Sequence, residues 1–503
     1  MITPDRNFDD GAEVHPTPDE SVMDSGRSGR SILSSVLTHT DHLTVDDDGQ
    51  LRIEGCSAKQ LLEEHGSPLS VVSESTLRAN ANRVRLAFED RWPAAVNVMF
   101  AIKANNNIAV RRVLSSLGLG GDCFSRGEIY ATLAGGTDPS RVALNGSNKS
   151  TEAIAEAIEC GIVINLDSMD ELLLVEEIAL TAGQRARVAV RLRLDGSKYD
   201  AARDRDSSLP DLRHFIDTEQ VGSSRNAARD LLDAAMASER MHAVGYHFHL
   251  GRLSRLPAYY RWWSAGVAEL VEELWRDTAF VPEILNIGGG YAREREPERG
   301  DETLMNPYTI EDYAETVTGQ LRIVFECNDI SAPELWLEPG RYLAGNAGLL
   351  LCRVGAVKSD VGMTWVNVDV SINNLPRVEN AGWDYVALPA SNMDAPTGSR
   401  SDVVGSLCVG KHLKIDIALP HLGREDVLAF LDTGAYAETA STQYNAVPRP
   451  ATVLVHENRS WVIKRRETIE DLFALHVVPA HLEDAGMNPR SHQLHTAHPE
   501  GKS

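Results

Sequence analysis

The chain has 503 residues, of which 43% are hydrophobic and 24% are charged, so it is long enough for two folded domains with tails. Its net charge of −24 argues against nucleic acid or an anionic membrane as a partner. Six scattered cysteines, without a CxxC pair or zinc-ligand spacing, predict no metal site and suit the reducing cytoplasm. The sequence starts without a basic-then-apolar signal, and no apolar run approaches membrane length, so we expect a soluble cytoplasmic protein.

The N-terminal region changes in composition at about residue 40. Residues 1–50 hold eleven Asp and Glu against three Lys and Arg, and large apolar residues are few before residue 40. We therefore expect residues 1–40 to form a disordered acidic tail. Residues 41–75 carry short strand and helix signals, and we expect this segment to join a C-terminal β domain.

Residues 76–341 alternate short apolar runs with helical segments about eight times. This repetition predicts an α/β fold, a (β/α)₈ barrel rather than an open sheet. Two charged stretches, residues 195–218 and 291–307, interrupt the pattern and are predicted to be surface loops. The predicted barrel strands are residues 98–102, 120–123, 142–144, 163–165, 188–194, 244–249, 284–287 and 335–338.

After residue 341 the sequence shows short strands without long helices between them. This pattern predicts an all-β domain over residues 342–475, with residues 452–463 as one of its strands. Residues 469–475 have the apolar spacing of a terminal helix, and residues 476–503 are predicted to be a flexible polar tail.

Lys103 ends the first predicted barrel strand, and three asparagines follow it. Barrel enzymes assemble their active sites at this end of the strands. Loss of hydration there would lower the pKa of the lysine and free its amine for imine chemistry. For a lone lysine, a side chain that reaches solvent would be the better interpretation, so the motifs downstream decide.

Three further motifs lie at predicted strand ends. The glycines at 288–290 would let backbone N–H groups approach an anion such as phosphate, although glycines also serve plain turns. Glu338 and Arg341 flank a turn after the last barrel strand; arginine is a natural phosphate partner, and an Arg–Glu surface pair is the alternative. His247 and His249 share one face of a strand end, where a lone histidine would be structural but a pair at the same rim as the lysine indicates a site.

Taken in order, these motifs resemble the fold-type-III pyridoxal-phosphate decarboxylases, most closely the diaminopimelate decarboxylase branch, from about residue 50 to 475. The resemblance implies a barrel that binds pyridoxal 5′-phosphate, followed by a β domain. It also implies decarboxylation of an amino acid through a Schiff base on Lys103 and a quinonoid intermediate. The matching segments are residues 100–105, 121–122, 127–128, 145–150, 165–168, 248–251, 287–290, 338–341, 432–436, 444–445 and 448–450.

The resemblance implies a role for each residue of the cofactor site. Lys103 would hold the cofactor and later carry a proton, His249 would stack on the pyridine ring, and Glu338 would keep the ring nitrogen protonated. In the related alanine racemases an arginine stands in place of this glutamate, so a carboxylate favours decarboxylation over racemisation. The other cofactor residues that it implies are Asp122, Arg191 (with Arg193 as a rival, because the register is ambiguous), Gly288, Gly289, Gly290, Gly340, Arg341 and Tyr436.

On the substrate side the match is partial. Cys408 matches the family cysteine that reaches into the partner subunit's site and helps to deliver a proton, which implies a homodimer with shared sites; a buried strand cysteine is the alternative. Arg377 and Tyr444 match substrate-binding positions, and Arg252 stands where a phosphate-binding serine is usual, so it could bind phosphate or a substrate carboxylate. Val409 stands where the family carries an acidic residue for the distal amine of the substrate. A valine cannot pair with an ammonium, so we expect an amino-acid substrate other than meso-diaminopimelate, with an uncharged or acidic side chain.

Three alternatives to a decarboxylase remain open at this point. One is a racemase or aldolase-type enzyme of the same fold, and another is a non-catalytic protein that binds pyridoxal phosphate. The third is a barrel without a cofactor, which colourless purified protein would support. Glu338 argues against the racemase, and the second domain together with Cys408 argues against the carrier.

Overall fold

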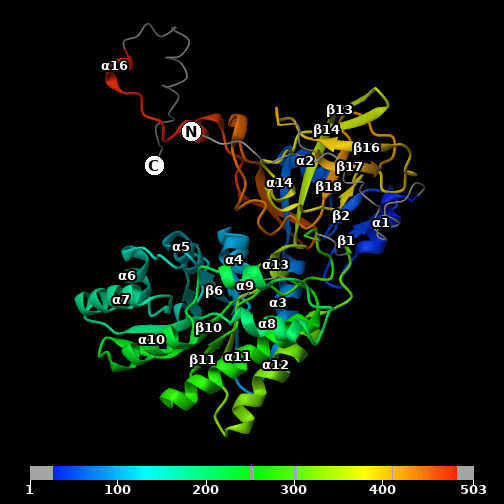
Figure 1. Ribbon diagram of the computed structural model, residues 1–503. Coiled ribbons are helices and arrows are strands. Elements are labelled where there is room, and N and C mark those ends of the chain that lie inside the picture. The colour runs from blue at the N-terminus through cyan, green and yellow to red at the C-terminus, as the bar shows by residue number, and fades with distance from the viewer. Residues whose placement is uncertain (1–26, 250, 252–253, 299–302, 410–411, 484–503) are drawn as a thin grey trace, which may run out of the picture.

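A computed structural model describes residues 27–249, 251, 254–298, 303–409 and 412–483. It contains a barrel and a β domain beside it, with the barrel in cyan and green and the β domain mostly in yellow and orange (Figure 1). Arg252, a predicted substrate residue, lies outside the described residues, as do residues 1–26 and 484–503 of the two predicted tails.

The barrel is closed by eight parallel strands in sequence order, β5 pairing with β12 to complete the ring. The predicted (β/α)₈ fold is therefore confirmed, with strand boundaries within three residues of those expected. The strands are β5 (Val96–Ala101), β6 (Gly120–Cys123), β7 (Val142–Leu144), β8 (Val163–Leu166), β9 (Ala186–Leu192), β10 (Met241–Phe248), β11 (Ile284–Asn286) and β12 (Glu334–Leu337).

Helices cover the outside of the barrel, and most begin at a capped residue. Ser150, for example, accepts a hydrogen bond from the N–H of Ala153, which fixes the start of α6 as its sequence predicts. The prediction of a surface loop over residues 195–218 is wrong, because this segment contains two short helices, α8 and α9. The helices are α3 (Glu74–Glu89), α4 (Ile108–Ser115), α5 (Arg126–Ala134), α6 (Thr151–Cys160), α7 (Met169–Ala182), α8 (Gly196–Arg203), α9 (Arg213–Thr218), α10 (Arg225–Ala237), α11 (Pro257–Thr278), α12 (Ile310–Cys327) and α13 (Arg341–Ala344), with the 3₁₀ turns η2 (Ile102–Ala104) and η3 (Pro139–Arg141).

The interior of the barrel is filled by a compact apolar layer. Trp336 on β12 is its largest member and is buried. Small and medium side chains from β5 and from β7 to β11 pack around the Trp336 side chain, as expected for a packed barrel core. The layer consists of Met99, Ala143, Val163, Ala189, Val244, Ile284 and Trp336.

The β domain is built on one mixed sheet with the order β17-β16-β14-β13-β4-β19-β20, and β18 pairs with β13 and β15. Strand β4 comes from the segment before the barrel and lies between β13 and β19, so residues 69–73 belong to this sheet. The expected single strand at 452–463 is wrong: β19 and β20 form a hairpin. The elements are β4 (Leu69–Ser73), β13 (Gly348–Asp360), β14 (Met363–Val368), α14 (Pro376–Ala381), β15 (Ala387–Leu388), β16 (Arg400–Val404), β17 (His412–Ala418), β18 (Val427–Phe430), η4 (Tyr444–Ala446), β19 (Ala451–His456) and β20 (Arg459–Lys464).

The segment before β4 is more ordered than its composition indicates. The disorder expected up to residue 40 is wrong for the described part, because a helix, α1 (Gly29–Val36), is capped by Ser28 and buries Ile32, Leu33 and Val36 against the β domain. A small sheet and one helix follow: β1 (Leu43–Val45), β2 (Leu51–Ile53), β3 (Cys56–Ser57) and α2 (Ala58–His65).

The last described residues, 465–483, contain two short helices, α15 (Ile469–Phe473) and α16 (Ala480–Glu483). Among the described residues, every helix is too short or too polar to cross a lipid bilayer.

Candidate active site

Above the apolar layer, at the carboxyl ends of the barrel strands, the interior becomes polar. Each of five strands contributes a buried side chain to this level, and the register places His247 beside both Arg191 and Asn286. Polar groups at this depth need partners from one another or from a ligand. The five are Asp122 on β6, Asn165 on β8, Arg191 on β9, His247 on β10 and Asn286 on β11.

Glu338 follows β12 directly and is the centre of this polar level. Asn145 and Asn286 donate hydrogen bonds to its Oε1 at 3.0 and 2.8 Å. His247 Nε2 lies 3.3 Å from Oε1, and His249 Nδ1 lies 3.6 Å from Oε2. Burial by itself would raise the pKa of Glu338, but His247 first, then His249 and the nearby lysine, lower it well below its usual range. The carboxylate is therefore ionised at neutral pH.

Asp122 is a second buried carboxylate in the same network. It accepts a hydrogen bond from Asn145 at 2.7 Å, and its Oδ2 lies 3.6 Å from Lys103 Nζ. Burial, followed by the charge of Glu338, raises the pKa of Asp122 to about 7. Of these two carboxyl groups, Glu338 thus carries a fixed charge and Asp122 titrates near neutrality.

Lys103 lies in the 3₁₀ turn that follows β5, and its amine is 4.5 Å from the centre of the Phe124 ring. The expected lowering of its pKa is wrong. Burial does lower the pKa of Lys103, but the charge of Asp122, with smaller effects of Tyr436 and Glu338, outweighs burial and raises it. The amine is therefore protonated at neutral pH.

The glycine loop after β11 packs directly against His249. The Gly289 N–H donates a hydrogen bond to His249 Nδ1 at 3.2 Å, and Tyr260 donates to the carbonyl of Gly290 at 3.0 Å. A Cβ on Gly288 would lie 2.4 Å from His249 Nδ1, at a φ of +65°, so only glycine fits. Burial lowers the pKa of His249 to about 3, with Lys103 the next cause. The imidazole is therefore neutral, as its role as a hydrogen-bond acceptor requires.

These groups surround one cavity of about 470 Å³ at the barrel mouth. Its lining brings together seven residues that the sequence predicted for one site: Lys103, His249, Gly290, Glu338, Gly340, Arg341 and Tyr436.

Arg341 enters this cavity from the first turn of α13. Its guanidinium forms an ion pair with Glu298, and its Nε lies 3.8 Å from Oε2 of Glu296. Its Cζ is also 5.7 Å from the centre of the Trp383 ring. An anion that enters the cavity would therefore compete with Glu298 for this guanidinium.

Tyr436 closes another side of the cavity, and Arg377 lies behind it. The backbone N–H of Tyr436 donates to the carbonyl of Ala104 at 2.8 Å. The guanidinium carbon of Arg377 lies 5.1 Å from the Tyr436 ring and 5.9 Å from the Trp383 ring. Arg377 is thus one side chain removed from the cavity.

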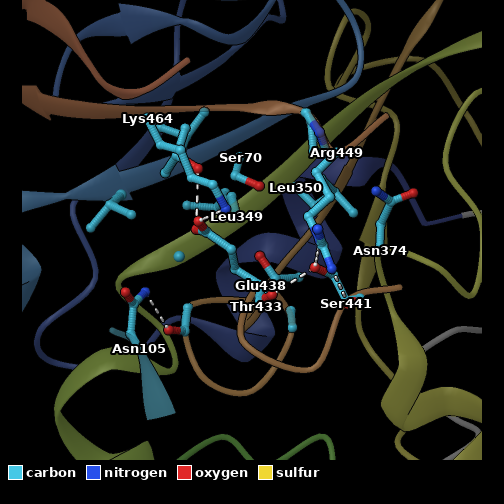
Figure 2. A pocket seen from close by; sticks show the side chains of 17 residues that line it. Ser70, Asn105, Leu349, Leu350, Asn374, Thr433, Glu438, Ser441, Arg449 and Lys464 are labelled. Carbon is cyan, nitrogen blue, oxygen red and sulfur yellow. Dashed lines mark hydrogen bonds and ion pairs between the residues drawn. The ribbon is translucent and has the colours of Figure 1, made fainter. Parts of the chain in front are cut away.

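Figure 2 shows a second cavity, which is lined in part by residues 433–434, 437–438 and 441 of the loop that joins β18 to β19. Glu438 accepts a hydrogen bond from Lys464 there at 2.7 Å, which anchors the loop to β20. The next residue, Thr439, donates to the carbonyl of Lys103 at 2.9 Å. The loop that carries Tyr436 is therefore held from both sides.

The structure distinguishes the two candidate arginines at the end of β9, Arg191 within the strand and Arg193 just after it. Arg191 is buried beside His247, whereas Arg193 is exposed and donates a hydrogen bond to the carbonyl of Glu219 at 3.0 Å.

Cys408 and Tyr444 lie together but outside the described lining of this cavity. The Cys408 sulfur is 3.6 Å from the Tyr444 hydroxyl and 3.4 Å from Asn445 Oδ1. The hydrogen bond with Tyr444, then that with Asn445, lowers the pKa of Cys408. Both Cys408 and Tyr444 are exposed, and Val409 beside them is half-buried.

The sequence-based list of site residues missed the buried amides. Asn165 donates to Asn145 Oδ1 at 2.7 Å, which links β8 to the two carboxylates through one chain of hydrogen bonds. A signal was present, since Asn145, Asn165 and Asn286 all stand at or directly after the ends of buried barrel strands.

This arrangement defines a class of protein. The site suits pyridoxal 5′-phosphate, group by group. The lysine at the barrel mouth fits the aldehyde, and the ionised carboxylate fits the ring nitrogen. The neutral imidazole fits the ring face, and the glycine loop fits the phosphate. The fold and the site together are those of a barrel enzyme that depends on this cofactor.

Comparison with known proteins supports the assignment to enzymes that depend on pyridoxal 5′-phosphate. The model of the family "Pyridoxal-dependent decarboxylase, pyridoxal binding domain" matches residues 74–345. The diaminopimelate decarboxylase of Methanothermobacter thermautotrophicus is 32% identical over 445 residues, which cover 88% of this chain and 98% of that protein. That of Bacillus subtilis is 29% identical, covering 85% and 95%. The crystal structure of diaminopimelate decarboxylase from M. jannaschii in complex with L-lysine has a TM-score of 0.80 and 28% identity, covering 89% of this chain and 100% of that one.

The chain belongs to the pyridoxal-dependent decarboxylases. It is an amino-acid decarboxylase that uses pyridoxal 5′-phosphate.

Proposed function

We propose that the cavity at the barrel mouth is the catalytic site, with Lys103 joined to the cofactor aldehyde. The observation that carries the proposal is that Lys103, His249 and Glu338, from three different strand ends, line one cavity. Borohydride reduction of the holoenzyme, followed by peptide mass spectrometry, tests it. The cofactor mass should be found on Lys103, and its attachment to another lysine would refute the assignment.

The residues around the cavity divide the chemistry between them. When bound, the cofactor supplies an electron-accepting ring that stabilises the carbanion left by the loss of CO₂. The ionised Glu338 would keep the ring nitrogen protonated, and the neutral His249 would offer its flat face to the ring. Asp122, whose pKa is about 7, would exchange a proton with Lys103.

Anionic groups have their own set of partners. The N–H group of Gly290, with Gly340 and Tyr436, is proposed to bind the phosphate, because these residues line the cavity and the N–H of Gly289 is already bonded to His249. Arg341 is proposed as a further anion-binding group. Arg191 would act indirectly, because its charge helps to lower the pKa of His247 and of His249.

A homodimer with shared sites is the proposed assembly. The exposed pair of Cys408 and Tyr444 supports it, since a thiol with a lowered pKa suits proton transfer and has no described contact with the cavity of its own chain. Cys408 of the partner subunit would then deliver a proton to the substrate carbon.

Mixed dimers test this arrangement directly. Lys103→Ala and Cys408→Ala are each expected to be inactive or nearly so, and unfolding and refolding them together should restore about a quarter of the wild-type sites. Failure to restore activity, with mixed dimers demonstrated by differential tagging, would exclude shared sites.

The proposed substrate is an amino acid without a distal ammonium group. Val409 offers no charge to such a group, and the charged residues proposed for the substrate side, Arg252 and Arg377, are cations. An unpaired buried charge costs a few kcal/mol, which corresponds to about a hundredfold in kcat/KM. The second candidate is meso-diaminopimelate, because the similar curated proteins carry the name diaminopimelate decarboxylase.

A panel of amino acids scored by CO₂ release separates these two candidates. We expect neutral or acidic amino acids to exceed meso-diaminopimelate in kcat/KM, and Val409→Glu to shift the preference towards meso-diaminopimelate. A higher kcat/KM for meso-diaminopimelate in the wild type would refute the proposed substrate class. The assignment of the chain as a decarboxylase would stand.

We also propose that the enzyme works in the cytoplasm. All six cysteines are free, which suits a reducing compartment. Fractionation of the native cells with antibody detection would test the location.

A further inference from the structure

The C-terminal arm, residues 465–483, leaves the β domain and extends away from the body of the chain (Figure 1, orange to red). Its apolar side chains face solvent: Leu475 is 93% and Val477 88% exposed. Two aliphatic side chains this exposed, within a segment of half-exposed apolar residues, are unusual for a surface that stays in water. The other exposed apolar residues of the arm are Ile469, Phe473, Val478 and Leu482.

The first part of the arm is nevertheless well organised. Thr468 and Asp471 cap α15 reciprocally, and Arg465 forms an ion pair with Asp471. These contacts hold Ile469 and Phe473 outward in a defined helix. A preformed segment loses less conformational entropy when it binds, so it suits an interface.

The root of the arm is bonded to the surface that carries Cys408 and Tyr444. Glu467 accepts hydrogen bonds from Gln443 at 2.8 Å and from the Arg449 guanidinium at 2.9 Å. Gln443 immediately precedes Tyr444, whose hydroxyl contacts Cys408. Arg449 also holds Ser441 in the same loop, as Figure 2 shows.

Strand β20 adds to this surface. It pairs only with β19 among the described strands, so its outer edge is an unpaired backbone. Trp461 and Val462 on this strand are about half exposed. The arm, the β20 edge and the loop with Tyr444 are therefore joined by chain continuity and by hydrogen bonds.

We infer that the arm packs its apolar side chains against a second copy of this chain and, through Glu467, couples assembly to the position of Tyr444 and Cys408. The inference rests on the proposed shared site. A subunit whose cavity receives Cys408 must cover the surface beside Tyr444, and the root of the arm lies on that surface. The proposed shared site would bring a second copy of the chain to that surface.

The test uses the full chain with its cofactor. The variant Leu475→Asp/Val477→Asp places charges at the two most exposed apolar positions of the arm. The matched control, Leu173→Asp, changes a residue that is 56% exposed on α7, on the outside of the barrel. The dimer dissociation constant is measured by sedimentation velocity, and CO₂ release per protomer is measured over a range of protein concentrations.

We expect the dissociation constant of the arm variant to rise about tenfold or more and the control to match wild type. Activity per protomer should fall in the dilute variant and recover when it is concentrated, which a merely unfolded chain would not do. A photo-crosslinker at residue 475 should give products of twice the chain mass.

Equal dissociation constants for the arm variant and the control, or crosslinks confined to one chain, would overturn the inference. In that case decarboxylation and restored activity in mixed dimers would show that the proposed function stands without it. If the arm variant assembles more weakly but the wild type decarboxylates no amino acid, the role of the arm in assembly is supported and the proposed catalytic site is refuted.

Discussion

Replacing Glu338 by glutamine removes one charge from the centre of the site and keeps its shape. The carboxylate Oε1 accepts hydrogen bonds from two amides, and a glutamine oxygen can keep them. What is lost is the anion that we assign to the ring nitrogen. Loss of one preorganised electrostatic group costs about 10²–10³ in rate, or about 3–4 kcal/mol, so kcat/KM should fall by that factor.

The same substitution should move a titration. The charge of Glu338 is, after burial, the main cause that raises the pKa of Asp122 from 3.8 to about 7. Without that charge the pKa of Asp122 falls, so the pH-dependent step in kcat/KM near pH 7 should move to lower pH. An Asp122→Asn variant should lack the step.

The assay is CO₂ release from the best amino acid of the panel, over a range of pH, with cofactor content checked by absorbance. Glu334→Gln is the matched control, because it makes the same change on the same strand, β12, at the end away from the site. A Glu338→Gln enzyme within threefold of wild type, or with an unmoved pH step, would refute both the role of the anion and its coupling to Asp122.

Three further outcomes are expected. Lys103→Ala should lose the visible absorbance of bound cofactor and all measurable turnover; retained absorbance would place the cofactor elsewhere. Gly288→Ala should weaken cofactor binding about tenfold or more, because its Cβ would lie 2.4 Å from His249 Nδ1; a cofactor titration with unchanged affinity would contradict this. Asp432→Asn should lower the free energy of unfolding by about 3–5 kcal/mol, because it removes the buried carboxylate that accepts hydrogen bonds from Arg295 at 2.7 and 3.0 Å; urea denaturation measures it, and a loss below 1 kcal/mol would argue against a paired charge.

Local patterns determined the barrel and the position of Lys103. Each barrel strand is a short, largely buried run, and most of the helices that follow have a capping residue and an apolar face, so both can be located from the sequence. The β domain was harder, because a hairpin turn is two residues long. At Glu457 and Asn458 the backbone φ is +47° and +64°, which turns the chain between β19 and β20 without a glycine or proline to mark it.

Charge and ionisation, in contrast, depended on the tertiary structure. The sequence indicates a lysine at an apolar strand end and hence a lowered pKa, but Asp122 from another strand lies 3.6 Å away and raises it. The helix α1 shows the same dependence, since its few apolar residues are buried only because the β domain lies against them.

By itself, the sequence determined the order of strands and helices, the lysine, the glycine loop and the glutamate of the last strand, because these follow from periodicity and residue type along one stretch of chain. Only the tertiary structure decided that Glu338 is ionised while Asp122 titrates, that Arg191 rather than Arg193 is buried in the barrel, and that Cys408 lies with Tyr444 outside the cavity. The physical reason is that a pKa and a hydrogen-bond network are set by groups that are close in space, and closing the barrel brings together residues that lie far apart in the chain.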